Sequence, residues 1–403
     1  MAMRRGRACE AAARERAACA GRMRGAAALL LLAVSAWLPA AAREQPQDAA
    51  AADGPRNVVL VTLDGVRVQE MFGGLDQAVA SANLASGQAP PDGAAAFARY
   101  RAADARTRRE RLMPFFWGTL MREHGWIAGN AALGSRVEVG NRMRFSNPGY
   151  AELLTGRARD DTVDSNDLIQ SPHPTVLEFV RAQLRLPKAK VAAFGSWDRL
   201  AKIPEHVPGS ITVNAGFMPF ADDDPGIRRL DAVQAQARTW REERFDAFTA
   251  AFALRYLQRE RPRLLYVGLG DTDEWAHAGR YADTLDGLAL ADAFLRELWT
   301  WLQSQPDYRD RTMLIVTTDH GRGRGVDDWT AHGPQVEGAQ DIWLAMAGPG
   351  QTARGELRDA PTLRQAQVAA TIAEAFGLDL RRQEPAAAPP VHAGARGGTG
   401  TAR

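Results

Sequence analysis

Aspartate residues follow three apolar, β-branched stretches of this sequence, and histidines come soon after two of them. The stretches and the residues after them are 57–63 with Asp64, 264–269 with Asp271 and Asp273, and 313–318 with Asp319 and His320. Uninterrupted apolar runs are typical of strands buried on both faces of a parallel sheet. Open α/β sheets place their ligands beyond the carboxyl ends of such strands. The three strand ends therefore predict one functional site.

Two further histidines complete a set of candidate metal ligands. His277 stands four residues after Asp273, so both side chains lie on one face if the chain is helical there. This spacing favours Asp273 over Asp271 as a ligand, and Asp271 remains the alternative. The candidate set is Asp64, Asp273, His277, Asp319, His320 and His332.

Carboxylates and imidazoles without cysteine suit zinc or manganese in a hydrolytic site rather than a structural zinc. Six ligands are enough for two ions. Two ions about 4 Å apart can hold both the attacking and the leaving oxygen of an in-line displacement. We therefore expect two divalent ions, most simply zinc, with manganese as the alternative.

Ser146 is the candidate nucleophile. Pro148 follows it by two residues, a pattern that predicts a helix start with serine as the cap. Backbone donors at a helix N-terminus can bind phosphoryl oxygens, and a metal can lower the pKa of a serine hydroxyl enough for attack. A plain cap without chemistry is the alternative for this residue.

Strands that alternate with helices over residues 57–380 predict one metal-dependent hydrolase domain of α/β class. The expected architecture is a three-layer α/β/α sandwich with a largely parallel central sheet. Residues 230–257 are expected to form a long helical stretch, and the interval 157–260 to include a small lid-like insertion. Residues 381–403 are rich in Ala, Pro and Gly, which predicts a disordered tail.

The first 42 residues predict export. An Arg- and Ala-rich leader precedes the uncharged apolar run 25–42, which ends in three alanines before Arg43. This pattern predicts a secretory signal peptide with an extended basic leader over 1–42, followed by a linker over 43–56. The expected location is periplasmic or secreted, without stable membrane association after cleavage. An uncleaved membrane anchor is the alternative.

Charge and cysteine usage narrow the range of functions. Residues 1–42 carry seven Arg and two Glu, so the formal net charge of +2 for the whole chain becomes −3 for the remainder. This balance gives no case for nucleic-acid binding. Both cysteines, Cys9 and Cys19, lie in the leader, which excludes a cysteine nucleophile and a disulfide from the exported chain.

Four patches between residues 57 and 380 resemble the alkaline phosphatase superfamily of metal-dependent phospho- and sulfohydrolases. They are Asp64-Gly65, Ser146 through Thr155-Gly156, Asp273 with His277, and Asp319-His320-Gly321 with His332-Gly333. They occur in the family's order, and the strongest likeness is to its type I phosphodiesterase and nucleotide pyrophosphatase branch.

The resemblance implies an assignment for each residue. One ion would be held by Asp273, His277 and His332, and the other by Asp64, Asp319 and His320. Ser146 would form a phosphoserine while a small-molecule phosphate ester is cleaved. Asn166 is the nearest match to the diesterase asparagine that binds the phosphoryl group, although it stands one residue out of register. Arg144 and Arg322 flank ligands and would contact the substrate's negative charge.

Several functions remain open from sequence. The motif of Ser146 has Tyr150 where sulfatase maturation needs arginine, which makes a sulfatase a minor alternative. Only about a hundred residues separate the nucleophile helix from Asp273, too few for the second domain of a phosphoglycerate mutase. An inactive binding protein should have lost a ligand or the serine, and none is missing here. The choice between phosphomonoesters and phosphodiesters is open.

Overall fold

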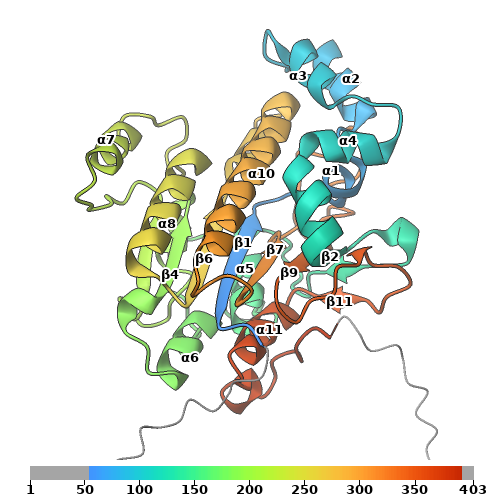
Figure 1. The fold of residues 1–403 in the computed structure, drawn as a ribbon. Coiled ribbons are helices and arrows are strands. Elements are labelled where there is room, and N and C mark those ends of the chain that lie inside the picture. Colours follow the sequence, from blue (N-terminus) through green and yellow to red (C-terminus); the bar gives the residue numbers. More distant parts are fainter. Residues whose placement is uncertain (1–53, 393–403) are drawn as a thin grey trace, which may run out of the picture. The chain divides into compact units, whose positions relative to one another are not determined.

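An eight-stranded sheet is the centre of the computed structural model, which describes residues 54–392 (Figure 1). Its strands are β1 Asn57–Leu63, β2 Gly125–Ala128, β4 Val191–Gly195, β5 Thr212–Ala215, β6 Leu264–Leu269, β7 Thr312–Thr317, β9 Leu344–Ala347 and β10 Gly355–Glu356. The order is β10-β2-β9-β7-β1-β6-β4-β5. β9 is antiparallel to β7 and β2, and the other neighbouring pairs are parallel.

The register of the three middle strands sets the position of the site. β1 lies between β6 and β7, and Leu63 pairs with Leu269 while Thr62 pairs with Thr317. The three strands therefore end at one level of the sheet. Because side chains alternate between the faces of a strand, residues of β1 pack alternately into two separate cores. The residues that follow the strands meet at the sheet's carboxyl edge.

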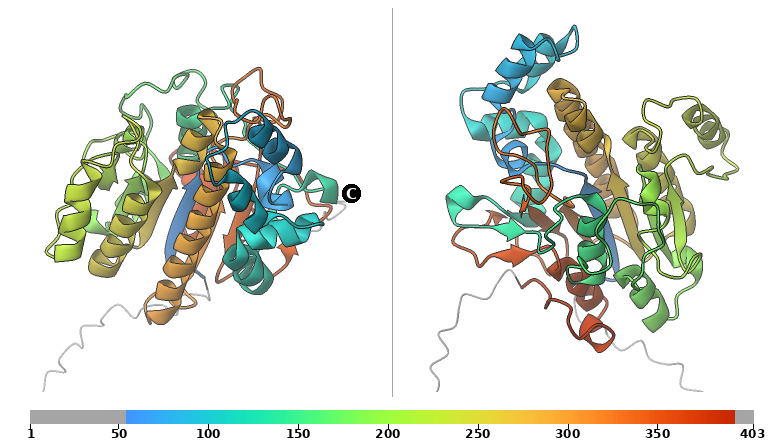
Figure 2. Two further views of the ribbon diagram at one scale, coloured as in Figure 1. Left: turned by 90° about the horizontal axis from the view of Figure 1, so that it is seen from above. Right: turned by 180° about the vertical axis from the view of Figure 1, so that it is seen from behind.

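Helices cover both faces of the sheet (Figures 1 and 2). One core packs against α8 Asp246–Glu260, α10 Tyr281–Ser304 and the π-helix η1 Phe116–His124. The other packs against α5 Ser146–Thr155, α6 Val176–Gln183 and α11 Gln367–Ala375. The expected three-layer arrangement with a largely parallel sheet is thus confirmed.

The remaining elements are short. The helices are α1 Val68–Gly73, α2 Gln77–Ala85, α3 Gly93–Tyr100, α4 Ala105–Leu112, α7 Pro225–Gln234 and α9 Asp271–His277. The 3-10 turns are η2 Ala131–Leu133, η3 Lys188–Lys190, η4 Asp198–Ala201 and η5 Leu380–Arg382. A second sheet has the order β11-β3-β8, with β3 Val137–Glu138, β8 Asp341–Ile342 and β11 Leu363–Arg364.

One expectation about the middle of the chain needs correction, and another stays a prediction. The interval 157–260, in which we expected a small lid-like insertion, supplies β4 and β5 to the main sheet and α6 and α8 to its faces. Within this interval, the segment around α7 stands apart from these layers (Figure 1). The helical stretch 230–257 is interrupted, since α7 ends at Gln234 and α8 begins at Asp246.

The ordered chain also extends beyond the predicted domain end at residue 380. Residues 381–392 are not a disordered tail, because Ala387 and Val391 are buried in the core that contains α11. The predicted signal peptide 1–42 and residues 43–53 of the linker lie outside the described residues, as do residues 393–403. Among residues 54–392, no helix is both long enough and apolar enough to cross a membrane.

Candidate metal centre

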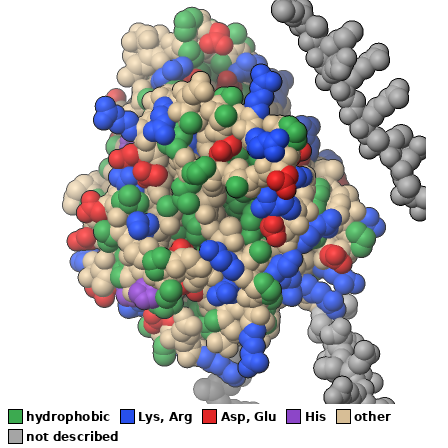
Figure 3. All heavy atoms as spheres, turned by 90° about the vertical axis from the view of Figure 1, so that its left-hand side faces the viewer, with side chains coloured by type: hydrophobic (Ala, Val, Ile, Leu, Met, Phe, Trp, Pro, Cys, Tyr) green, Lys and Arg blue, Asp and Glu red, His purple; other side chains and the backbone are tan. Residues whose placement is uncertain are grey.

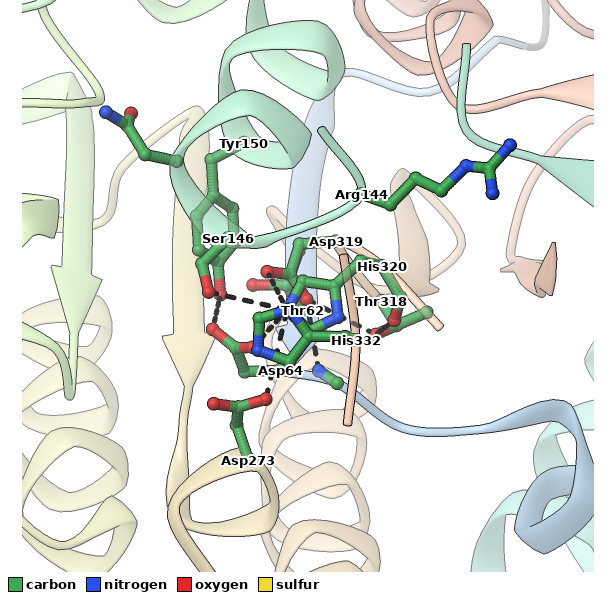
Figure 4. A network of polar contacts seen from close by, with 12 residues as sticks. Thr62, Asp64, Arg144, Ser146, Tyr150, Asp273, Thr318, Asp319, His320 and His332 are labelled. Carbon is green, nitrogen blue, oxygen red and sulfur yellow. Dashed lines mark hydrogen bonds and ion pairs between the residues drawn. The ribbon is translucent and has the colours of Figure 1, made fainter. Parts of the chain in front are cut away.

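The candidate ligands meet at the carboxyl edge of β1, β6 and β7, and Figure 4 labels all of them except His277. Asp64 directly follows β1, and Asp319 and His320 follow β7 by two and three residues. After β6 the chain turns through Gly270 into α9, which carries Asp273 and His277 one turn apart. The helical turn that the Asp273–His277 spacing required is present.

Asp64, Asp319 and His320 form the first group. His320 Nε2 lies 3.4 Å from Asp64 Oδ1 and 3.5 Å from Asp319 Oδ2. His320 Nδ1 lies 3.0 Å from the carbonyl of Gly321. Because a carbonyl only accepts, Nδ1 carries the proton, and the lone pair of Nε2 faces the two carboxylates. These three side chains present their donor atoms to one point.

Asp273, His277 and His332 form the second group. His277 Nε2 lies 3.0 Å from Asp273 Oδ2 and 3.0 Å from His332 Nε2. The two groups adjoin, since the rings of His320 and His332 stack with centroids 4.1 Å apart. Asp273 Oδ1 is also 3.8 Å from His320 Nε2, so His320 borders both groups.

Ser146 lies beside the first group at the N-terminus of α5. Its hydroxyl oxygen is 3.4 Å from His320 Nε2, and the residue is 6% exposed. The close approach of α5 depends on Gly149, because a Cβ there would lie 2.4 Å from the carbonyl oxygen of Asp319. The sequence thus brings the hydroxyl to the ligand groups with a glycine one turn along the helix.

Burial and neighbouring charges shift the pKa values of the candidate ligands. Burial raises the pKa of Asp64 and of Asp319 well above the ordinary value, and neighbouring carboxylates raise both further. Burial also opposes ionisation of Asp273, but Arg322 and then His277 outweigh it and hold the pKa of Asp273 well below its usual range. Burial, and next the nearby His320, lower the pKa of His332 to about 2, so its imidazole is neutral at ordinary pH.

This arrangement fits two divalent cations. Two donor atoms about 2.0 Å from a tetrahedral zinc lie about 3.3 Å apart, close to the separations within both groups. The buried atoms Asp64 Oδ1 and Asp319 Oδ2 have no hydrogen-bond partner among the described residues, and neither has His332 Nδ1. A cation would satisfy the two carboxylate oxygens and relieve the repulsion between the carboxylates.

Arg322 does not have the position expected of a substrate-binding residue. It is 2% exposed, and its guanidinium donates to the carboxylate and carbonyl of Asp273 and to the carbonyl of Thr330. The predicted contact with substrate is therefore corrected to a contact with a candidate ligand. Sequence proximity to His320 suggested the substrate, whereas the turn at Gly321 directs the side chain under Asp273.

Arg144 and Asn166 lie at the rim. The guanidinium of Arg144 extends away from the ligand groups (Figure 4) and is 3.4 Å from the carbonyl of Pro334. Asn166 Oδ1 accepts a hydrogen bond of 2.9 Å from the backbone N–H of Asn147, next to Ser146. Asn166 therefore reaches the nucleophile end of α5 despite its shifted register, and its amide N–H groups make no hydrogen bond among the described residues.

Asp271 turns to a different place from Asp273. Its carboxylate accepts a hydrogen bond of 2.9 Å from the backbone N–H of Asp246, at the start of α8. It does not join either ligand group, which settles the geometric choice between the two aspartates in favour of Asp273.

Tyr150 contacts a candidate ligand, and the sequence analysis did not predict this contact. Its hydroxyl donates to Asp64 Oδ2 over 2.7 Å and leaves Oδ1 facing His320. The available signal was its position four residues after Ser146, which puts both on one helix face. The aspartate it meets is 86 positions away in sequence, and only the fold reveals it.

Removing this hydroxyl tests its role. Tyr150→Phe is expected to weaken metal binding by about 10- to 100-fold, because the orientation of Asp64 loses its support while the buried ring is kept. The measurement is zinc affinity by competition with a chelating dye. Tyr266→Phe is the matched control, since that buried hydroxyl contacts Thr62 instead of a ligand. Equal zinc affinity in the two variants would contradict the role of Tyr150.

Comparison with known proteins agrees with this geometry. Residues 242–380 match a family model described as the Metalloenzyme superfamily. The wild-type alkaline phosphatase PafA aligns with a TM-score of 0.51 at 10% identity, over 81% of this chain and 96% of that chain. The phosphonate monoester hydrolase SpPMH from Silicibacter pomeroyi aligns with a TM-score of 0.50 at 14% identity, over 80% of this chain and 74% of that chain.

A search of curated proteins found no match to the sequence. The matched range contains five of the six candidate ligands, and the structural alignments extend the likeness over most of the chain. Residues 242–380 thus match the Metalloenzyme superfamily, and the fold of most of the chain is similar to the folds of PafA and SpPMH.

Proposed function

We propose that this protein is a metal-dependent hydrolase that cleaves phosphate esters through a phosphoserine at Ser146. The observation that carries the proposal is the Ser146 hydroxyl, 3.4 Å from His320 Nε2, beside two adjoining groups of carboxylate and imidazole donors. The names of PafA and SpPMH, a phosphatase and a phosphonate monoester hydrolase, are consistent with a phosphorus ester.

Different side chains would bind the ions, orient the ligands and bind the phosphoryl group. Asp273, His277 and His332 would hold one ion, and Asp64, Asp319 and His320 the other. When bound, the two ions would polarise the phosphoryl group and lower the pKa of the Ser146 hydroxyl. Tyr150 and Arg322 orient one carboxylate in each group. Asn166 lies where its free amide N–H groups would donate to a phosphoryl oxygen.

The reaction proceeds in two displacements. Ser146 Oγ loses its proton and forms a bond to phosphorus, while the bond from phosphorus to the ester oxygen breaks and the released alkoxide takes a proton. Water then forms a bond to phosphorus as the bond from phosphorus to Ser146 Oγ breaks, and the serine regains its proton. Substrate and one water thus give an alcohol and a phosphate product.

Within this class we propose phosphodiesters over phosphomonoesters. A monoester carries a second negative charge on the phosphoryl group, which an additional cationic side chain would stabilise. Neither predicted arginine supplies it, because Arg322 is bound to Asp273 and Arg144 extends away from the ligand groups (Figure 4). A diester monoanion needs no such partner.

We also propose that the substrate is a small molecule and that the protein is exported. Export rests on the pattern of residues 1–42. Acidic, basic and apolar side chains occur together on the protein face in Figure 3. The net charge of −3 after residue 42 supports a small-molecule substrate rather than a nucleic acid.

The proposed function is tested with matched aryl esters. The purified protein should hydrolyse an aryl phosphodiester faster than the corresponding phosphomonoester, and both faster than the sulfate ester. A chelator should abolish hydrolysis, and zinc should restore it. Preference for the sulfate ester would favour a sulfatase. No turnover of any ester in the presence of zinc or manganese would favour a binding protein.

A further inference from the structure

A separate group of buried carboxylates adjoins the metal centre. Glu243 precedes α8, Asp246 is the first residue of α8, and Asp271 is the first residue of α9. One oxygen from each lies within 4.8 Å of the others. Their exposed fractions are 4%, 6% and 3%. None of the three belongs to the two ligand groups described above.

Hydrogen bonds stabilise two of the three carboxylates in their buried positions. Asp246 accepts from the Ser196 hydroxyl over 2.5 Å and from the backbone N–H groups of Gly270 and Asp271 over 2.7 and 3.1 Å. Asp271 Oδ1 accepts in return from the backbone N–H of Asp246. These contacts join the starts of α8 and α9. They leave the second oxygen of Asp271 without a hydrogen bond among the described residues.

The buried carboxylate of Glu243 lacks such hydrogen bonds. Its carboxylate makes no hydrogen bond or ion pair among residues 54–392, and its Oε1 is fully buried. The carboxylate lies directly against Gly270, where a Cβ would be 1.8 Å from Oε1. Glycine at position 270 therefore allows the carboxylate to enter the group. An ionised carboxylate in such a place is costly without a counter-charge.

The nearest arginine in sequence forms no hydrogen bond or ion pair with the three carboxylates among the described residues, and its charge reaches Asp246 only through space. Arg244 is completely buried, and its guanidinium donates to the side chains of Asn214, Gln234 and Thr249. These three partners lie in β5, α7 and α8, and none of them is one of the three carboxylates. Three converging carboxylates are thus left with unused acceptor oxygens and no cationic side chain bonded to them.

We propose that Glu243, Asp246 and Asp271 bind a hard divalent cation, Ca²⁺ or Mg²⁺, at a site distinct from the two-ion centre. A donor set of carboxylate oxygens alone favours these ions over zinc. The ion joins the segment before α8 to the start of α9. Since α9 also carries Asp273 and His277, the ion anchors the helix that supplies two of the three ligands of the second group. The site does not depend on the proposed hydrolysis.

The test uses the full chain with its zinc sites filled. Equilibrium dialysis against Ca²⁺ should show one additional ion per chain, and Mg²⁺ should compete for it. Glu243→Gln keeps the shape of the side chain and should weaken Ca²⁺ binding by about tenfold or more. Glu242→Gln is the matched control, because the neighbouring Glu242 side chain is 53% exposed and contacts Arg199. The control should bind Ca²⁺ like the wild type.

Two further measurements test the proposal even if a variant folds poorly. Ca²⁺ should raise the thermal unfolding temperature of the wild type saturably, and Asp271→Asn should lose this response. Zinc content, measured in the same preparations, reports whether the two-ion centre is intact. The proposal is overturned if the wild type binds neither Ca²⁺ nor Mg²⁺, or if Glu243→Gln binds Ca²⁺ as tightly as the wild type.

Discussion

Ser146→Ala is expected to lower the turnover of a phosphate ester by at least about 1000-fold while leaving the bound metal unchanged. The alanine removes the only atom that forms the covalent bond to phosphorus. It keeps all six candidate ligands, and among them, within the described residues, the lost hydroxyl contacts only His320 Nε2. The measurement is steady-state turnover together with metal content on the same preparation.

Ser165→Ala provides the matched control for this variant. Ser165 lies next to Asn166, and its hydroxyl contacts only Asp167, while its carbonyl, which the substitution keeps, accepts from Asn147. Turnover within about twofold of the wild type is expected, because no ligand contact changes. An alanine variant at 146 with wild-type turnover would remove Ser146 from the mechanism.

His332→Ala should reduce bound zinc by about one ion per chain and reduce hydrolysis to near background. The imidazole is neutral and its Nε2 faces His277 Nε2 at 3.0 Å, so its loss removes a donor from the second group. The first group keeps Asp64, Asp319 and His320. Bound zinc is measured by elemental analysis after gel filtration.

His206→Ala controls for the loss of a histidine. Its imidazole contacts the carbonyl of Ser171 and lies in an exposed segment far along the chain from the ligands. This variant should retain the wild-type zinc content. If His332→Ala also retained it, the assignment of His332 to the second group would be wrong.

The sequence was most informative where an apolar run stops at a charged residue. The ends of β1, β6 and β7 could be predicted because each buried strand is followed by aspartate, and parallel pairing brings such ends together. The pair Asp273 and His277 could be predicted because helical spacing is local. These local signals indicated five of the six candidate ligands, whereas the division of the six into two groups came from the family resemblance.

Contacts between distant side chains could not be predicted in the same way. Tyr150 reaches Asp64, and Arg322 reaches Asp273, only because α5 and the chain after β7 pack against the same sheet edge. Sequence placed Arg322 near the substrate because it follows His320 closely. Its burial beneath Asp273 depends on the direction in which the chain leaves Gly321, and a motif does not encode that direction.

The break between α7 and α8 has a similar cause. Apolar spacing over 230–257 predicted continuous helix, yet residues 235–245 leave the helix and bring Glu243 and Arg244 into buried positions. Arg244 donates a hydrogen bond to Asn214 in β5, a contact that helical spacing cannot reveal. The tail beyond residue 380 was misjudged because its Ala-rich composition does not show that Ala387 packs beside Gly156.

A crystal structure of the zinc-loaded protein, with anomalous data collected at the zinc absorption edge, tests the central claim most directly. The account predicts two zinc peaks, one among Asp273, His277 and His332 and the other among Asp64, Asp319 and His320, with the Ser146 hydroxyl beside the second. A single peak, or zinc bound away from these side chains, would contradict the two-metal centre on which the proposed hydrolysis rests.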